Sequence, residues 1–201
     1  MNTKRILALI FSLLGWFALA AQYYLMLQSR ETTTIEITIN YFSYFTILTN
    51  LLVAVYFTRE VFTINSIKSR SSGRLTAITI YILVVGIIYQ LLLRSGELTG
   101  MQWTANELLH SLIPVFTLIY WYLYEDKKNL TYQLIPKWTI YPLLYLVYIL
   151  IRGTISGSYP YPFINVADLG IAKALMNAFW IAVFFIVLSV IFVKIGKLID
   201  K

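Results

Sequence analysis

Six apolar stretches, separated by short polar connections, dominate the pattern of hydrophobic and polar positions along the chain. They span residues 6–27, 39–58, 75–93, 108–124, 138–151 and 171–195. A helix needs about 20 predominantly apolar residues to cross the hydrocarbon core of a bilayer. The pattern therefore predicts an all-α, polytopic integral membrane protein with about six transmembrane helices, built as a single transmembrane domain over residues 1–201.

Composition points the same way. Hydrophobic residues make up 59% of the chain and charged residues only 12%, whereas soluble domains carry about 25% charged residues. The net charge of +7 comes from basic residues scattered at the ends of the apolar stretches. They form no basic stripe with interleaved aromatics, so we predict no nucleic-acid partner. The absence of cysteine excludes disulfide and thiolate chemistry.

The first apolar stretch also fits a cleaved signal peptide, because Lys4 and Arg5 precede it and an Ala-Leu-Ala sequence, 18–20, lies near its end. The apolar run continues through residues 23–27, however, which is longer than a usual signal core. We therefore expect this stretch to be retained as a helix.

The positions of Lys and Arg predict the orientation. If the N-terminus is inside, only four of the 16 basic residues fall outside: Arg30, Arg94, Arg152 and Lys173. Cytoplasmic loops carry an excess of Lys and Arg. The sequence thus predicts a multi-pass protein of the cell membrane with both termini cytoplasmic.

The second stretch carries a cluster of polar residues within the sequence YFSYFTILTNLL. Ser43, Thr46 and Asn50 are spaced i, i+3, i+7 and would share one helix face, with Thr49 beside them. Lipid cannot satisfy such a face, so it must point into the helix bundle. Hydrogen bonding between helices is the simplest role for these residues.

The fourth stretch begins with a second polar cluster, NELLHSLIP. It contains His110, which is the only histidine in the sequence. A zinc site needs three or four ligands, so we predict neither a metal nor another cofactor. Asn106 and Glu107 precede His110 by one turn, and either residue is placed to orient its ring.

With the predicted orientation, Thr46 and His110 both lie several to about 10 Å below the outer surface, at about 1.5 Å of rise per residue. Arg94, Arg152 and the Tyr- and Pro-rich segment 159–163 belong to the same side. This convergence favours a functional site. A threonine hydroxyl becomes a nucleophile when a base accepts its proton, and imidazole is the natural base near neutral pH.

Substrate-binding roles follow for the neighbouring residues. Side chains such as Asn50, Ser43 and Arg152 can supply hydrogen bonds to a developing oxyanion, and Ser111 is a further donor. Arg94 or Arg152 would hold a carboxylate of the substrate. Tyr159 and Tyr161, with their neighbouring prolines, would form a lid. The predicted partners are a lipid or fatty-acyl ester substrate and the membrane lipids, and the sequence indicates no oligomeric state.

These clusters carry a resemblance to a known family. YFSYFTILTNLL, NELLHSLIPVFTLIYW and the end of WTIYPLLYLVYILIRGTISGSYPYPF resemble the androgen-induced and androgen-dependent TFPI-regulating membrane proteins and their small bacterial relatives. The resemblance implies a multi-pass threonine hydrolase that cleaves fatty-acid esters of hydroxy fatty acids. It implies that Thr46 is the nucleophile, with Thr49 one turn away as the alternative, and that His110 is the essential histidine.

Two other interpretations remain open. The same polar pocket would also suit a transporter or a lipid-binding protein that performs no reaction. A structural or assembly subunit would use the polar face for helix contacts alone.

Overall fold

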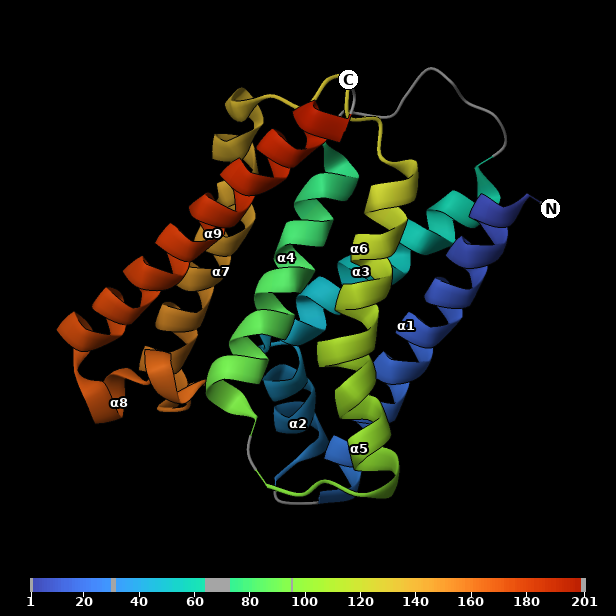
Figure 1. The fold of residues 1–201 in the computed structure, drawn as a ribbon. Helices are drawn as coiled ribbons and strands as arrows, with labels where there is room; N and C mark the ends of the chain where they lie inside the picture. The colour runs from blue at the N-terminus through green and yellow to red at the C-terminus, as the bar shows by residue number, and fades with distance from the viewer. Residues whose placement is uncertain (1, 30–31, 64–72, 95, 200–201) are drawn as a thin grey trace. The chain divides into compact units, whose positions relative to one another are not determined.

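The computed structural model describes residues 2–29, 32–63, 73–94 and 96–199, and these residues form helices and loops with no strand among them (Figure 1). The predicted all-α class is confirmed. The α-helices are α1 (Thr3–Ser29), α2 (Thr34–Tyr41), α3 (Phe45–Phe62), α4 (Arg74–Ile88), α5 (Gly100–Glu107), α6 (Ile113–Tyr124), α7 (Ile135–Ser156), α8 (Val166–Leu169) and α9 (Ile171–Ile199). Two π-helices, η1 (Tyr89–Leu93) and η2 (Leu108–Leu112), and two 3₁₀-helices, η3 (Tyr132–Leu134) and η4 (Pro162–Ile164), complete the described elements.

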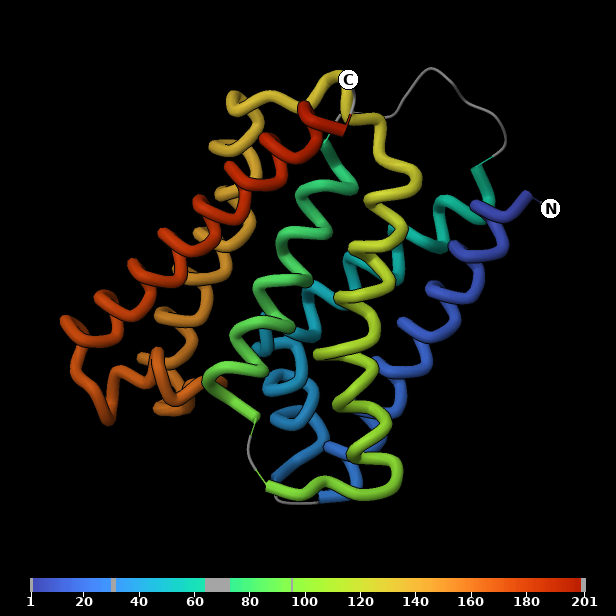
Figure 2. The backbone as a smooth tube through the Cα atoms, viewed as in Figure 1, coloured from blue at the N-terminus to red at the C-terminus, as the bar shows by residue number. Residues whose placement is uncertain are grey.

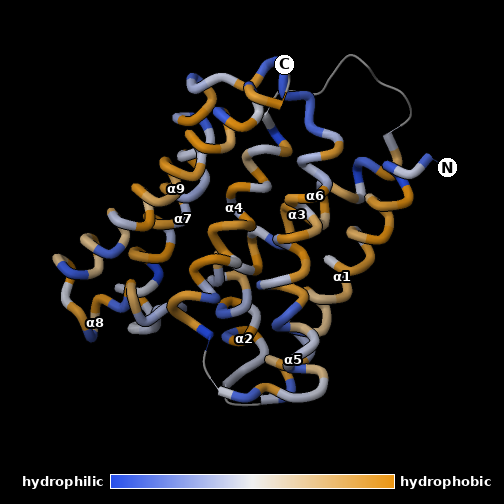
Figure 3. The backbone as a smooth tube through the Cα atoms, viewed as in Figure 1, coloured by the Kyte–Doolittle hydropathy of each residue, from blue (hydrophilic) through white to orange (hydrophobic). Residues whose placement is uncertain are grey.

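Five helical segments of the described chain are long and apolar enough to cross a membrane. They are Thr3–Ser29, Phe45–Phe62, Arg74–Leu93, Tyr132–Ser156 and Ile171–Ile199. Figure 3 shows hydrophobic residues along most of the length of α1, α4, α7 and α9. This composition is that of a membrane protein, because lipid and not water is the solvent that suits such exposed apolar surfaces.

A sixth span stays a prediction. The elements α5, η2 and α6 follow one another without a gap, with 8, 5 and 12 residues. Together they are long enough to cross a bilayer, but this segment is less apolar and is not among the five. The cytoplasmic position of both termini likewise stays a prediction, and Arg30, one of its outside charges, is not among the described residues.

The predicted continuous span 39–58 is interrupted, and α2 and α3 are separate helices (Figure 1, Figure 2). In a continuous α-helix the Ile39 carbonyl would accept the Ser43 N–H. Instead, the Ser43 hydroxyl donates to Ile39 O at 2.6 Å, and the Ser43 N–H bonds Asn40 O at 3.0 Å. The serine side chain thus competes with the helical backbone at this point and ends α2.

The chain clusters into two compact units, residues 1–126 and 127–201. In the first unit α1 packs against α3, where Gly15 approaches Ala54 so closely that an added Cβ would lie 3.2 Å from the alanine Cβ. Ser12 and Thr58 join the same two helices by a hydrogen bond of 2.7 Å. The retention of the first stretch as a helix stays a prediction.

The second unit consists of α7 and α9 with the short elements between and before them. Few residues of either long helix are buried, and large aliphatic side chains such as Leu144, Ile155 and Leu198 are exposed. Exposed apolar faces of this extent suit contact with lipid chains.

Candidate functional site

Two π-helical turns shape the polar end of the first unit. In η1 the Arg94 N–H bonds Tyr89 O at 2.8 Å, five residues back. In η2 the Ile113 N–H bonds Leu108 O, also five residues back. Such turns are rare and occur often at functional sites, because the extra residue displaces side chains from their regular positions. Here η2 carries His110 and η1 begins with Tyr89.

Pro114 explains why a side chain of α3 forms a hydrogen bond with the backbone of η2. Continuing the π register would bond residue 114 to Leu109 O, but proline has no N–H. The Asn50 side chain fills this role, because its Nδ2 donates to Leu109 O at 3.2 Å. The same nitrogen also donates to Thr46 O at 2.8 Å. One buried amide group therefore ties the first turn of α3 to the π-turn that carries the histidine.

The two residues predicted to react, Thr46 and His110, thus come from segments that contact each other. Thr46 is buried on the first turn of α3, and Thr49 is fully buried one turn further on. Asn50 lies one turn after Thr46, as a helix face requires. Within the described residues no hydrogen bond joins the His110 ring to the Thr46 hydroxyl.

The orientation of His110 is fixed on two sides. Its ring stacks on the Tyr89 ring, with centroids 4.0 Å apart and 22° between the planes. Its Nδ1 lies 3.0 Å from Asn106 O, and because a carbonyl only accepts, Nδ1 must carry the proton. In the neutral ring the lone pair then resides on Nε2. The sequence predicted an orienting role for Asn106 or Glu107, and Asn106 fulfils it through its backbone.

Asn106 also orders the stacking partner. Its Nδ2 donates to the Tyr89 hydroxyl at 2.5 Å. Tyr89, Asn106 and His110 therefore form a closed triangle of one ring stack and two hydrogen bonds. The stack fixes the plane of the imidazole, and the hydrogen bond to Asn106 O fixes its rotation within that plane.

A ring of four polar side chains joins the C-terminal end of η1 to the junction of α5 and η2. Arg94 donates to Glu107 Oε1 at 2.7 Å and to Gln90 Oε1 at 2.7 Å. Ser111 donates to Glu107 Oε2 at 2.7 Å and accepts from Gln90 Nε2 at 2.9 Å. The ring links η1 to η2. Arg94, a predicted carboxylate anchor, therefore already holds a carboxylate of its own chain.

The backbones of α4 and η2 approach each other closely at Gly86. A Cβ on Gly86 would lie 2.9 Å from His110 O and within 3.3 Å of the Pro114 ring. A glycine is thus required here, because any side chain would push α4 away from η2.

Ser43 takes a different position from the one predicted. It is buried in the turn before α3 and donates to Ile39 O, so it does not share a helix face with Thr46 and Asn50. The residues of the predicted face that lie together on α3 are Thr46 and Asn50.

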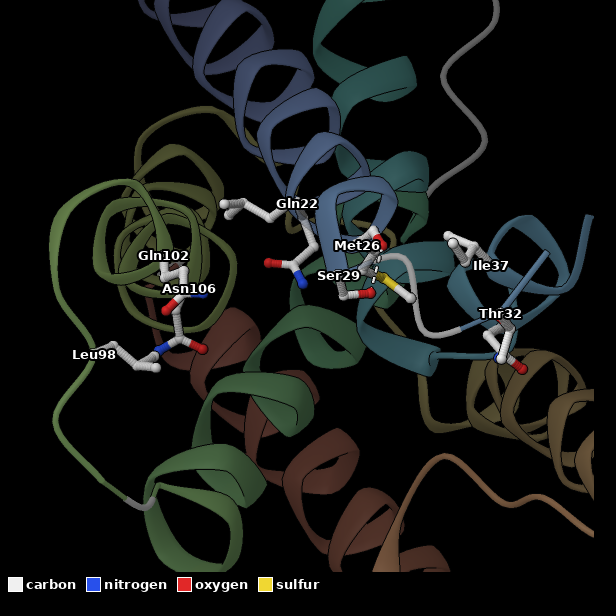
Figure 4. Close-up of a pocket in the computed structure, with 10 residues that line it drawn as sticks. Gln22, Met26, Ser29, Thr32, Ile37, Leu98, Gln102 and Asn106 are labelled. Atoms are coloured by element: carbon white, nitrogen blue, oxygen red, sulfur yellow. Dashed lines mark hydrogen bonds between the residues drawn. The ribbon is translucent and has the colours of Figure 1, made fainter. Parts of the chain in front are cut away.

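A cavity of ≈ 400 Å³ opens beside this site, entirely within the first unit. It lies between the C-terminal end of α1, α2, and α5 with the residues just before it (Figure 4). Its described lining consists of Gln22, Leu25, Met26, Ser29, Thr32, Ile37, Asn40, Leu98, Gln102 and Asn106. Asn106 belongs both to this lining and to the contacts of His110, so the cavity adjoins the histidine.

The remaining predicted residues belong to the second unit. Arg152 donates to Ser158 O at 2.9 Å. The Tyr159 ring covers Gly153, where any Cβ would overlap it. Tyr161 stacks on Phe163 with ring centroids 5.1 Å apart. These contacts order the segment after α7, as its prolines and aromatics predicted, while its role as a lid stays a prediction.

Sequence reasoning missed Tyr89, Gly86 and the cavity. The i, i+4 pairs Gln90–Arg94 and Glu107–Ser111 were a detectable signal for the polar ring, whereas the stack on Tyr89 had none. No known protein family, curated protein or solved structure matches the chain. The family resemblance of the polar motifs therefore stays a prediction.

Proposed function

We propose that the protein is a membrane-embedded hydrolase of a lipid ester, with Thr46 as the nucleophile and His110 as the general base. The single observation that carries the proposal is the state of His110. Its Nδ1–H is held by Asn106 O, which leaves Nε2 as the proton acceptor. Asn50 ties the turn that carries this base to the turn that carries Thr46.

The proposed reaction proceeds in two steps. The Thr46 Oγ1 attacks the ester carbonyl carbon while His110 Nε2 takes the hydroxyl proton, and that proton then passes to the departing alcohol. The resulting threonyl ester is hydrolysed when His110 accepts a proton from water, which attacks the acyl carbon. His110 then returns that proton to Thr46 Oγ1 as the fatty acid leaves, which restores both groups.

The polar neighbours divide into two roles under this proposal. Asn50 is a positioning residue, because its Nδ2 already donates to two backbone carbonyls. Ser43 and Ser111 donate to Ile39 O and to Glu107. We therefore assign none of the three as the oxyanion donor, and they act by holding the reacting segments in place.

Turnover by the purified protein tests the proposal. The protein in nanodiscs would be offered a p-nitrophenyl fatty-acyl ester and a fatty-acid ester of a hydroxy fatty acid. We expect Thr46→Ala and His110→Ala to abolish turnover, and Thr46→Ser to retain part of it. Thr79→Ala is the matched control, because Thr79 is another fully buried threonine of the same unit, bonded to Leu75 O. Wild-type turnover in Thr46→Ala and Thr49→Ala alike would reject the threonine mechanism.

A second candidate function is non-catalytic binding or transport of a lipid. Two observations favour it: the cavity beside His110, and the lack of a hydrogen bond between His110 and Thr46 among the described residues. Saturable lipid binding without turnover or covalent adduct in the wild-type protein would select this function over hydrolysis.

A further inference from the structure

The lining of the cavity has an unusual chemical uniformity. Its polar groups are four carboxamides, from Gln22, Asn40, Gln102 and Asn106, and two hydroxyls, from Ser29 and Thr32. The described lining contains no charged side chain. Figure 4 shows Gln22 on the side of α1 that faces Gln102 and Asn106 of α5.

Carboxamides offer both a donor and an acceptor. A hydroxyl of a ligand also donates and accepts, so each hydroxyl can pair with one amide in both directions. The side chains of Gln22 and Gln102 make no hydrogen bond with another described residue. Their amides are therefore available to a ligand without the loss of an internal hydrogen bond.

An anionic group fits this lining poorly. A carboxylate binds most strongly where a cation pairs with it. The guanidinium of Arg94 on the adjoining segment is ion-paired with Glu107 at 2.7 Å. The polar part of the cavity thus offers hydrogen bonds and no unpaired positive charge from its described residues.

The rest of the lining is apolar. Leu25, Met26, Ile37 and Leu98 lie among the amides. A volume of ≈ 400 Å³ is within the range of small-molecule pockets, about 300–1,000 Å³. The combination suits a ligand with a hydroxyl-bearing head and the beginning of a hydrocarbon chain.

We propose that this cavity binds the uncharged, hydroxyl-bearing head of a lipid ester, of which a glycerol monoester is the simplest example. The inference rests on the proposed function for the identity of the ligand as substrate, and Asn106 provides the geometric link. Its side chain lines the cavity, and its carbonyl holds the His110 ring. A head group bound there places its ester beside the base.

Equilibrium binding to the Thr46→Ala protein in nanodiscs tests the inference separately from catalysis. The probes are radiolabelled 1-oleoylglycerol and oleate. We expect 1-oleoylglycerol to bind at least about ten-fold more tightly than oleate. Gln22→Leu and Gln102→Leu should each weaken 1-oleoylglycerol binding by about two- to ten-fold, the effect of one lost hydrogen bond, and should leave oleate binding unchanged.

Two variants serve as controls. Gln133→Leu changes an exposed glutamine of η3 outside the cavity and should leave both affinities unchanged. Gln102→Lys adds a cation to the lining and should reverse the preference toward oleate. Equal or tighter binding of oleate by the parent protein, or glutamine variants without effect, would overturn the inference.

The failures of the two proposals are distinguishable. If 1-oleoylglycerol binds selectively but the wild-type protein neither hydrolyses it nor forms an adduct, the head-group site stands and the hydrolase proposal fails. If esters are hydrolysed in a Thr46-dependent reaction without preference for the uncharged head, the hydrolase proposal stands and the head-group inference fails.

Discussion

The imidazole of His110 lies flat against the ring of Tyr89, with centroids 4.0 Å apart, and the Tyr89 hydroxyl accepts a hydrogen bond from Asn106. Asn106 O in turn accepts a hydrogen bond from the Nδ1–H of His110. The tyrosine therefore contacts the face of the proposed base and also fixes the residue that sets its tautomer. This relationship makes Tyr89 the most informative residue for testing how the histidine is held.

Substituting Tyr89 should separate the two contacts. Tyr89→Phe keeps the ring stack and removes the hydroxyl, so it should lower kcat/KM for ester hydrolysis by about two- to ten-fold, the equivalent of one hydrogen bond of about 0.5–1.5 kcal/mol. Tyr89→Leu also removes the aromatic pair, a further loss of about 0.5–1.5 kcal/mol. Steady-state kinetics of the three proteins check this order. Equal activity in Tyr89→Leu and wild type would show that the stack does not position the base.

Gly86→Ala should destabilise the first unit. The new Cβ would lie 2.9 Å from His110 O, and backbone cannot yield as a flexible side chain can. We expect a loss of about 1–3 kcal/mol in the free energy of unfolding, as for other overpacked sites, measured by denaturant titration in detergent.

The control for this substitution is Gly196→Ala in α9. There the nearest atom is the end of the Leu130 side chain, 2.8 Å from the added Cβ, which can move. Alanine also favours helix over glycine, so this variant should be neutral or slightly more stable. Similar destabilisation of both variants would mean that the contact of α4 with η2 is not the cause.

The polar ring on η1 and η2 should show energetic coupling between Arg94 and Glu107. The Arg94 guanidinium lies 2.7 Å from Glu107 Oε1, but the Arg94 side chain is 49% exposed. We therefore expect a moderate coupling energy, because water screens the pair. A double-mutant cycle with Arg94→Met and Glu107→Gln should give about 0.5–1 kcal/mol, in the upper range for exposed ion pairs. Strictly additive effects on unfolding would assign the ring no joint role.

Labelling of engineered cysteines tests the sixth span and the orientation. The natural sequence has no cysteine, so each variant carries a single reactive thiol. Thr99 and Asn129 are exposed residues on either side of the segment formed by α5, η2 and α6. In intact cells a membrane-impermeant maleimide should label Thr99→Cys, and should label Asn129→Cys only after permeabilisation. If both positions react alike in intact cells, the segment does not cross the membrane.

The sequence predicted what depends on hydropathy and helical spacing. The long apolar runs define the helices, and the positions of Asn106 and Glu107 one turn before His110 predicted that one of them orients the ring. Ser43 shows where this reasoning ends, because its hydroxyl competes for a backbone carbonyl and breaks a helix whose hydropathy is continuous.

The features that were not predicted depend on three-dimensional neighbours. Tyr89 and His110 are 21 positions apart in the sequence, and their stack joins a residue of η1 to a residue of η2. Pro114 gave a partial signal, since a missing N–H must leave a carbonyl for another donor. Only the fold identifies Asn50 as that donor.

Covalent labelling by a fluorophosphonate probe, followed by peptide mapping of the adduct, tests the central claim most directly. The account predicts one adduct on Thr46 in the wild-type protein, lost in Thr46→Ala, strongly reduced in His110→Ala, and retained in Thr49→Ala and Thr79→Ala. An adduct on another residue, or undiminished labelling of Thr46→Ala, would contradict it.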